Sequence, residues 1–301
     1  MNETHPAPTP FTIGGVTVGG RRGETPIVLI GSLFYHRQKI VVDAATGSFD
    51  RTAAEALITR QDELADKTGN PCMIDVVGAS AAALPKYLDF VAATTDAPMV
   101  MDGITATINV AGLDYARACG LIDRIVYNSL IPRSDPAEVK AIQATGVESA
   151  VLLALNTKDF TGRGRVAAID ALLPVATAAG ITKPLLDTCV LDVATLGQAC
   201  WALTPLKTKY GLPVGCGPHN ATSRITKQLR AKYGPQAPTL CAASANVMTA
   251  AVGADFLLYG PIEAAATVFP IIGLVDAANG QMIMDHGVTL DRTHPRYRIL
   301  R

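Results

Sequence analysis

Six Asp and Asn side chains lie in or shortly after short apolar runs along the chain. They are Asp75, Asp102, Asn128, Asn156, Asp187 and Asn220. Carboxylates and carboxamides suit an uncharged, amide-rich heterocycle such as a pterin, whose 2-amino and ring N–H groups pair with a carboxylate and whose ring oxygen and nitrogens pair with a carboxamide. No Lys or Arg lies at these run ends. The set therefore lacks the counter-charges that a phosphate or carboxylate substrate needs.

Each of these residues also has an ordinary structural explanation. A single Asp or Asn after a strand commonly caps the next helix, which is the alternative for Asp102 and Asn156. Asp75 lies inside its apolar run and is equally explained as a buried, hydrogen-bonded carboxylate. Asn128 is equally explained as a turn residue. The joint pattern favours a binding site more strongly than any one member does.

Eight apolar runs position these side chains. They occupy residues 27–33, 72–78, 98–103, 124–130, 149–156, 184–191, 212–217 and 254–260. Continuous apolarity over so few residues is typical of strands buried on both faces. Helix signals separate the runs, such as Asp135-Pro136 followed by Glu138, and Gly146 at a helix end. The pattern predicts an α/β fold, a closed (β/α)8 or TIM barrel whose chemistry lies at the carboxyl ends of its strands.

An open, doubly wound sheet is the alternative fold. It is disfavoured because no Gly-rich dinucleotide loop follows the first run. No linker divides residues 1–301, so we expect one barrel domain. We expect residues 11–20 to form a hairpin that caps the barrel bottom, and residues from about 285 to 301 to form an exposed polar tail or an interface segment.

The composition excludes several classes of protein. Lys+Arg and Asp+Glu both number 26, which argues against nucleic-acid and membrane-surface binding. No segment reaches about 20 uninterrupted apolar residues, and no secretory signal is read at the N-terminus, so we expect a cytoplasmic protein. The six cysteines form no CxxC pair, and Cys216 with His219 lacks a second pair of ligands. We therefore expect free thiols and no bound metal.

Three loops carry other polar clusters. The loop after the first run holds Tyr35, His36, Arg37 and Lys39, which fit either an acidic substrate tail or a partner's docking rim; an ordinary solvated loop is the alternative. Gly215 belongs to a Gly-rich loop whose backbone could approach a ligand closely. The stretch from Gly162 to Arg165 follows Lys158 and is interpreted as a solvated helix start rather than a phosphate contact.

Several of these motifs resemble the H-subunit family of tetrahydromethanopterin S-methyltransferase, over about residues 11–280. The resemblance rests on Ile30–His36, Thr68–Pro71 with Asp75–Val77, Tyr127–Ser129, Gly211–Cys216 with Asn220-Ala221, and Phe256–Glu263. That family includes bacterial relatives that move a methyl group between a corrinoid protein and tetrahydrofolate. It is related to the pterin-binding barrels of methyltetrahydrofolate:corrinoid methyltransferases and dihydropteroate synthases.

The resemblance implies a pterin site at the barrel mouth. Asp102, Asn128, Asp187 and Asn220 would match the family's ring-binding positions, and Asp75 would be a polar neighbour. We add Asn156 and Gly215 as pterin contacts, assign Asn220 to a hydrogen bond near N5 and Asp75 to a proton path, and place the partner's rim at Tyr35, His36, Arg37 and Lys39. The reaction implied is methyl transfer from a corrinoid, carried by a separate protein, to N5 of tetrahydrofolate in a demethylation pathway. We also expect a homodimer.

Three alternatives stay open. The pterin could be tetrahydromethanopterin, because both pterins share the same core ring. A dihydropteroate-synthase-like enzyme would use the same pocket but needs a basic anchor for pyrophosphate, which the strand ends lack. A non-catalytic pterin-binding subunit would bind the ring without chemistry.

Overall fold

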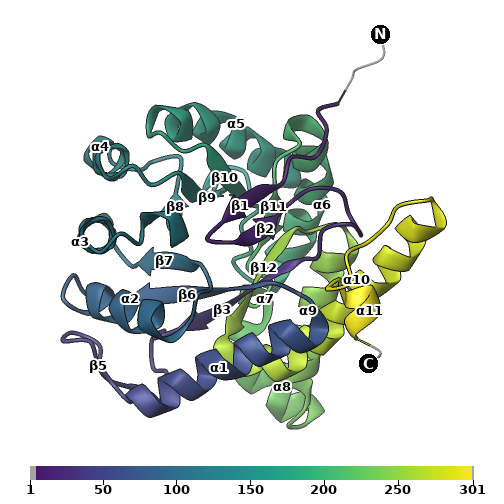
Figure 1. Cartoon of the computed structure of the whole chain (residues 1–301), viewed down its shortest axis with the longest axis horizontal. Helices are drawn as coiled ribbons and strands as arrows, with labels where there is room; N and C mark the ends of the chain where they lie inside the picture. Colours follow the sequence, from purple (N-terminus) through teal and green to yellow (C-terminus); the bar gives the residue numbers. More distant parts are fainter. Residues whose placement is uncertain (1–4, 300–301) are drawn as a thin grey trace.

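The computed structural model describes residues 5–299 and shows a closed barrel of eight parallel strands (Figure 1). The strands are β3 (Val28–Leu33), β6 (Cys72–Gly78), β7 (Met99–Gly103), β8 (Ile125–Leu130), β9 (Ser149–Leu153), β10 (Lys183–Asp187), β11 (Val214–Cys216) and β12 (Phe256–Pro261). Chain order is the same as order around the barrel, and β12 pairs with β3 to close it. The predicted (β/α)8 fold and the eight predicted strands are confirmed.

Helices follow each strand and form an outer ring (Figure 1). They are α1 (Arg51–Thr68), α2 (Ala83–Thr94), α3 (Ala106–Ala118), α4 (Pro136–Thr145), α5 (Gly162–Ala178), α6 (Val193–Tyr210), α7 (Asn220–Ser223), α8 (Thr226–Tyr233), α9 (Ala237–Ala251), α10 (Ala265–Asp285) and α11 (Pro295–Arg298). A small hairpin of β4 (Val41–Asp43) and β5 (Ser48–Phe49) precedes α1.

Local sequence signals set the helix ends as predicted. Asp135 caps α4 by accepting the backbone N–H of Ala137, Pro136 occupies the first turn, and Gly146 ends the helix with φ 75°. That left-handed conformation favours glycine because a Cβ would be strained there. Helix α1 is built the same way, between Asp50 and Gly69.

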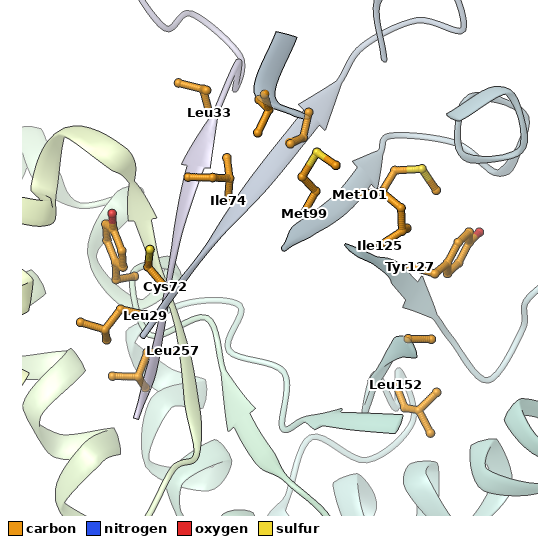
Figure 2. Close-up of a cluster of buried hydrophobic side chains, with 14 of the residues drawn as sticks. Leu29, Leu33, Cys72, Ile74, Met99, Met101, Ile125, Tyr127, Leu152 and Leu257 are labelled. Carbon is orange, nitrogen blue, oxygen red and sulfur yellow. The ribbon is translucent and has the colours of Figure 1, made fainter. Parts of the chain in front are cut away.

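The strand residues divide between two apolar cores. Side chains such as Ile74, Met99, Met101 and Ile125 point outward beneath the helices, as Figure 2 shows. Their neighbours in sequence point inward and fill the barrel as a separate cluster that includes Val28, Ile30, Met73, Val100, Val126, Val151, Leu185 and Phe256. Since side chains alternate across a strand, this division fixes which face every later residue of each strand occupies.

A hairpin closes the amino-terminal end of the barrel. Strands β1 (Phe11–Ile13) and β2 (Val16–Val18) pair antiparallel, and their buried residues Ile13 and Val18 belong to the inward cluster. With one end plugged, ligands have access to the inward polar residues only from the carboxyl ends of the strands. The hairpin lies where residues 11–20 were predicted to form one.

The segment at the C-terminus differs from its sequence interpretation. The predicted tail from about 285 to 301 folds back on α10 through α11 and buries Leu290 and His294; residues 300–301 lie outside the described part of the chain. One helical segment of the described chain, Ile262–Asp285, is long and apolar enough by length and composition to cross a membrane. In this fold α10 is a barrel helix, because Val268, Phe269 and Ile272 are buried in the outer core.

Candidate active site

Four predicted site residues form one polar layer inside the barrel. Each lies two residues beyond a member of the inward apolar cluster: Asp75 after Met73, Asp102 after Val100, Asn128 after Val126, and Asp187 after Leu185. The period of two therefore turns all four side chains toward the barrel axis. Ser32 joins the layer in the same way, two residues after Ile30 of β3. The layer lies toward the carboxyl ends of the strands, as catalytic groups do in this fold.

Asp75 is buried and only half satisfied. Its side chain is 3% exposed, and its Oδ2 accepts a 2.6 Å hydrogen bond from the hydroxyl of Ser32, which faces it across the β3–β6 pair. Its Oδ1 is buried without a partner in the described chain. Burial, followed by the charge of Asp102, raises the pKa of Asp75 well above its usual range. This carboxyl therefore favours its protonated form.

Asp102 and Asn128 lie directly opposite each other on β7 and β8. Burial raises the pKa of Asp102 to about 6. Neither side chain makes a hydrogen bond to residues 5–299; only the backbone carbonyl of Asn128 is used, as an acceptor from the Asn109 side chain. A carboxylate and a carboxamide with free hydrogen-bonding groups therefore stand side by side in the polar layer.

Asp187 ends β10 and is held by the loop that follows it. Its Oδ1 accepts a 2.7 Å hydrogen bond from the backbone N–H of Cys189, which adopts a left-handed φ of 61°. Burial raises the pKa of Asp187 to about 7, against the lowering effects of that N–H and of the nearby Arg165 guanidinium. This carboxyl therefore gains and loses its proton near neutral pH.

Arg165 corrects the interpretation of residues 162–165 as a solvated helix start. Its side chain is 2% exposed. Its guanidinium donates to the carbonyls of Thr188 and Cys189, at 2.7 and 2.9 Å, and to that of Phe160. A buried guanidinium is tolerated when its donors are satisfied, and here they fix the loop that positions Asp187.

Asn220 is the first residue of α7 and reaches back toward the loop after β10. Its Nδ2 donates to the carbonyl of Val190 at 3.1 Å. Its Oδ1 makes no hydrogen bond to the described residues and remains an acceptor. The structure thus brings Asn220 next to the Asp187 loop, although it lies 30 residues from Val190 in sequence.

Contacts within the protein explain the presence of Asn156 and Gly215 at their positions. The Asn156 amide donates to the carbonyl of Gly164, and its oxygen accepts the backbone N–H groups of Lys158 and Asp159. A Cβ on Gly215 would lie 2.2 Å from the carbonyl oxygen of Phe256 on the neighbouring strand. Asn156 shapes its loop and Gly215 permits close strand packing, so these contacts give both residues a structural explanation.

The loop after β3 is anchored from beneath and exposed above. Gln38 is buried and donates to Glu263, which also accepts from the Tyr35 hydroxyl, and Phe34 stacks on Tyr87 with ring centroids 4.0 Å apart. Burial and then the Glu263 charge raise the pKa of Tyr35 to about 12. His36, Arg37 and Lys39 are exposed. Tyr35 therefore belongs to the support of this loop, and the three other residues to its outer surface.

Residues 5–299 contain no group of three His, Cys, Asp or Glu side chains that could hold a metal ion. Cys216 is buried in β11, and no third ligand joins it and His219.

The sequence matches the family described as "Tetrahydromethanopterin S-methyltransferase MtrH subunit" over residues 9–290. The H subunit of tetrahydromethanopterin S-methyltransferase from Methanopyrus kandleri is 36% identical over 296 residues, which cover 92% of each chain. The same subunit from Methanothermobacter thermautotrophicus is 36% identical over 299 residues and 96% of each chain. The chain belongs to the MtrH family.

Solved structures similar to this MtrH family member share its barrel. Dihydropteroate synthase from Xanthomonas albilineans, in complex with 7,8-dihydropteroate, aligns with a TM-score of 0.62 and 17% identity, over 90% of this chain and 98% of that one. The Thermus thermophilus dihydropteroate synthase, in complex with 4-aminobenzoate, aligns with a TM-score of 0.57 and 15% identity, over 89% and 98%. At such low identity these matches establish the fold alone.

Sequence reasoning missed two parts of the site in this MtrH family member. Ser32 carried a usable signal, because it continues the inward period of Val28 and Ile30. Nothing in the sequence indicated the role of Arg165, because a Gly-Arg-Gly-Arg stretch has the composition of a solvated loop. Only the tertiary contact with the Thr188–Cys189 loop explains its burial.

Proposed function

We propose that this protein is a methyltransferase that moves a methyl group between N5 of a tetrahydropterin and the cobalt of a corrinoid carried by a separate protein. Membership of the MtrH family supports the reaction class. The observation that carries the proposal is the unused hydrogen-bonding capacity of the polar layer. Asp75 Oδ1, the Asp102 carboxylate and the Asn128 amide all lack protein partners in residues 5–299 while they face the barrel axis.

The polar layer fits a pterin ring. A carboxylate accepts two parallel N–H groups, which the 2-amino and ring N–H of a pterin supply on one edge; one of Asp102 and Asp187 takes this role, and the other lies at the edge that holds N5. The Asn128 amide can donate to the ring oxygen and accept from a ring N–H. The inward residues of the layer that we identify are Ser, Asp and Asn, so they favour an uncharged ring over a phosphorylated one.

The N5 position needs a proton acceptor in one direction and a donor in the other. When the N5 lone pair attacks the methyl carbon, a nitrogen–carbon bond forms and both electrons of the cobalt–carbon bond stay on cobalt, so N5 must release its proton. A carboxyl whose pKa is near the working pH serves best in both directions. Burial gives that property to Asp102, with a pKa of about 6, and to Asp187, with a pKa of about 7.

Asn220 contributes its free Oδ1 near the loop that holds Asp187. We assign it to hydrogen bonding at N5, where charge changes during transfer, because fixed dipoles aimed at such an atom stabilise the transition state. No covalent enzyme intermediate is required. The barrel's main contribution is to hold N5 and the methyl carbon in line.

The proposal has two forms, which differ in the pterin that serves as substrate. The relatives are named for tetrahydromethanopterin, which favours that pterin as the substrate. The tetrahydrofolate interpretation remains the alternative, since the polar layer addresses only the ring that both pterins share. Competition between the two pterins for one enzyme preparation distinguishes them.

Cobalt absorbance during turnover tests the proposal. The protein is mixed with methylcobalamin, or a methylated corrinoid protein, and with each tetrahydropterin in turn. We expect loss of the methyl-cobalt spectrum and formation of the N5-methylpterin. Asp102→Asn should slow methyl transfer at least about 100-fold, because an amide cannot take up the proton. Asp114→Asn, on the exposed face of α3, is the matched control and should keep full activity.

Two outcomes would contradict the proposal. Pterin binding without methyl transfer from any methyl-corrinoid would favour a non-catalytic binding subunit. Condensation of a pterin pyrophosphate with 4-aminobenzoate would favour a dihydropteroate-synthase-like enzyme.

A further inference from the structure

The carboxamide of Asn109 stands between the ends of β7 and β8, the two strands that carry Asp102 and Asn128. These strands lie side by side (Figure 2), and Asp102 opposite Asn128 is the last pair of their ladder. Just beyond that pair, Asn109 Oδ1 accepts the backbone N–H of Gly103 at 2.6 Å, and its Nδ2 donates to the backbone carbonyl of Asn128 at 3.2 Å. One side chain therefore joins the residue after Asp102 to the backbone of Asn128.

At the neighbouring β6–β7 pair, backbone groups make the corresponding contact directly. There the N–H of Ile104 donates to the carbonyl of Gly78 at 3.2 Å. Hydrogen bonds in a parallel ladder are slanted, so the next β7–β8 bond would join the Gly103 N–H to the Asn128 carbonyl. The Asn109 carboxamide takes the place of that bond. Because an amide with a hydrogen bond on each side spans a wider gap than one bond of about 2.9 Å, it holds the two strand ends apart.

The first turn of α3 and one glycine make this contact possible. Asn109 is 3% exposed, and its backbone N–H donates to the carbonyl of Thr105, whose side chain caps α3. A Cβ on Gly103 would lie 2.5 Å from Asn109 Oδ1, which is too close for a real side chain. Glycine at residue 103 therefore lets the carboxamide reach the β7 backbone.

We propose that Asn109 is a positioning residue for the tetrahydropterin, because it sets the separation of Asp102 and Asn128 and thereby the alignment of the ring. This inference rests on the proposed function, which assigns the ring to those two side chains. Neither side chain makes a hydrogen bond to residues 5–299, so their positions follow from the backbone that Asn109 holds. Small misplacements of binding groups weaken paired hydrogen bonds and slow the reaction. Asn109 itself contributes no group to the chemistry.

Calorimetry with tetrahydromethanopterin and tetrahydrofolate tests this role. Asn109→Ala removes both hydrogen bonds, so the dissociation constant of the pterin should rise at least about tenfold. Asn70→Ala is the matched control. Asn70 is also buried, and its Nδ2 donates to the carbonyl of Ile27 and to Asp276, but it precedes β6 at the amino-terminal end of the barrel. Asn70→Ala should lower the free energy of unfolding and leave the pterin dissociation constant within about twofold of the wild type.

Asn109→Asp covers the case in which Asn109→Ala fails to fold. The introduced carboxyl has nearly the same shape. Its protonated form can donate to the Asn128 carbonyl as Nδ2 does, whereas its ionised form places an oxygen against that carbonyl. Relative to the wild type at the same pH, the pterin dissociation constant should be nearly unchanged at about pH 5 and raised at least about tenfold at about pH 8. A loss of stability alone would not change this ratio with pH.

Gly103→Ala reaches the same contact from the β7 side. The added methyl group displaces the carboxamide oxygen, so pterin affinity should fall as it does in Asn109→Ala. When both substitutions are combined, the methyl group enters the space that the carboxamide leaves. The double variant should therefore bind the pterin no more weakly than the weaker of the two single variants. Additive losses would show that the two residues act separately and would contradict the proposal.

Pterin binding is measured without a methyl donor, so its outcome is separate from that of the methyl-transfer assay. A wild-type protein that binds a pterin but transfers no methyl group would contradict the proposed function and leave the role of Asn109 in place. Wild-type affinity in Asn109→Ala, and in Asn109→Asp at about pH 8, would overturn the role of Asn109 and leave the proposed function in place. A wild-type protein that binds neither pterin would overturn both.

Discussion

The hydroxyl of Ser32 donates a 2.6 Å hydrogen bond to Oδ2 of Asp75 and leaves Oδ1 of the same carboxyl buried without a partner in residues 5–299. Burial raises the pKa of Asp75, so the carboxyl favours its protonated form. Because Oδ2 already accepts from Ser32, the proton of Asp75 belongs on Oδ1. Asp75 is therefore prepared to donate a hydrogen bond into the polar layer, which suits a substrate acceptor or a water on a proton path.

Removing the Ser32 hydroxyl should change both rate and pH dependence. The hydrogen bond from Ser32 lowers the pKa of Asp75, so Ser32→Ala should raise that pKa and keep Asp75 protonated to higher pH. We expect the alkaline limb of kcat/KM to move to higher pH. The rate should fall about tenfold, since a buried hydrogen bond to a carboxyl contributes about 1.5 kcal/mol. Ser48→Ala, at an exposed site on β5, is the control, and a profile identical to it would contradict the role of Ser32.

Asp187→Asn should separate binding from proton transfer. The amide keeps an oxygen that can accept the N–H of Cys189, and the Arg165 contacts to the loop involve only backbone carbonyls. The loop should therefore persist, while the group whose pKa lies at about 7 is lost. We expect transfer to slow at least about 100-fold and the acid limb of the rate profile to flatten. Wild-type kinetics in Asp187→Asn would exclude this residue as the base.

The raised pKa values also predict how stability depends on pH. Asp102 has a folded pKa of about 6, and Asp187 and Asp276 have folded pKa values of about 7, all raised chiefly by burial. An unfolded chain releases these protons near pH 4, and the folded chain keeps them until the pH passes the folded pKa. These groups therefore make their full contribution to the free energy of unfolding below about pH 4. That contribution is lost as the pH rises toward 7.

Urea denaturation at a series of pH values measures this effect. Asp187→Asn removes one of the three groups, so its free energy of unfolding should exceed that of the wild type by about 1–3 kcal/mol at pH 8 and match it near pH 4. Asp114→Asn, exposed on α3, should follow the wild type at every pH. Equal destabilisation of Asp187→Asn at both pH values would contradict the assignment.

Asn220→Ala should affect the rate more than the affinity. Its Oδ1 is free but its Nδ2 donates to Val190, so the substitution removes a hydrogen bond at N5 and one anchor of the neighbouring loop. We expect the transfer rate to fall about 100-fold, as for loss of one transition-state donor or acceptor. The dissociation constant of the pterin, measured by calorimetry, should change by no more than about threefold. An unchanged rate with methylcobalamin would exclude Asn220 from the reaction.

The placement of the polar layer could be predicted from sequence because it depends on local periodicity. Continuous apolar runs indicated eight strands. Asp75, Asp102, Asn128 and Asp187 continue the inward alternation of their strands, each two residues after a member of the inward apolar cluster. The hydrogen-bonding state of each residue could not be predicted. It depends on which strand residues stand opposite each other, and the closure of a barrel sets that register.

The missed contacts are all long-range. Arg165 reaches Thr188 and Cys189 through the packing of α5 against the β10 loop, and Gln38 reaches Glu263 across 225 positions of sequence. The sequence marked Asn156 and Asn128 in the same way, yet the amide oxygen of Asn156 is occupied by two backbone N–H groups of its own loop. Residue type and strand position alone do not distinguish a free carboxamide from a satisfied one.

Charge reversal on the loop after β3 should weaken the reaction with the corrinoid protein specifically. Arg37 and Lys39 are exposed, and the anchors beneath them, Gln38 and Tyr35, hold the loop through Glu263. Arg37→Glu and Lys39→Glu should each raise KM for the methylated corrinoid protein about tenfold, more at low ionic strength, because rim charges chiefly affect association. Free methylcobalamin should react at the wild-type rate, since the polar layer is untouched. Arg21→Glu, beside the hairpin at the opposite end of the barrel, is the matched control. If Arg37→Glu and Lys39→Glu behaved like Arg21→Glu with the corrinoid protein, docking would lie elsewhere on the rim.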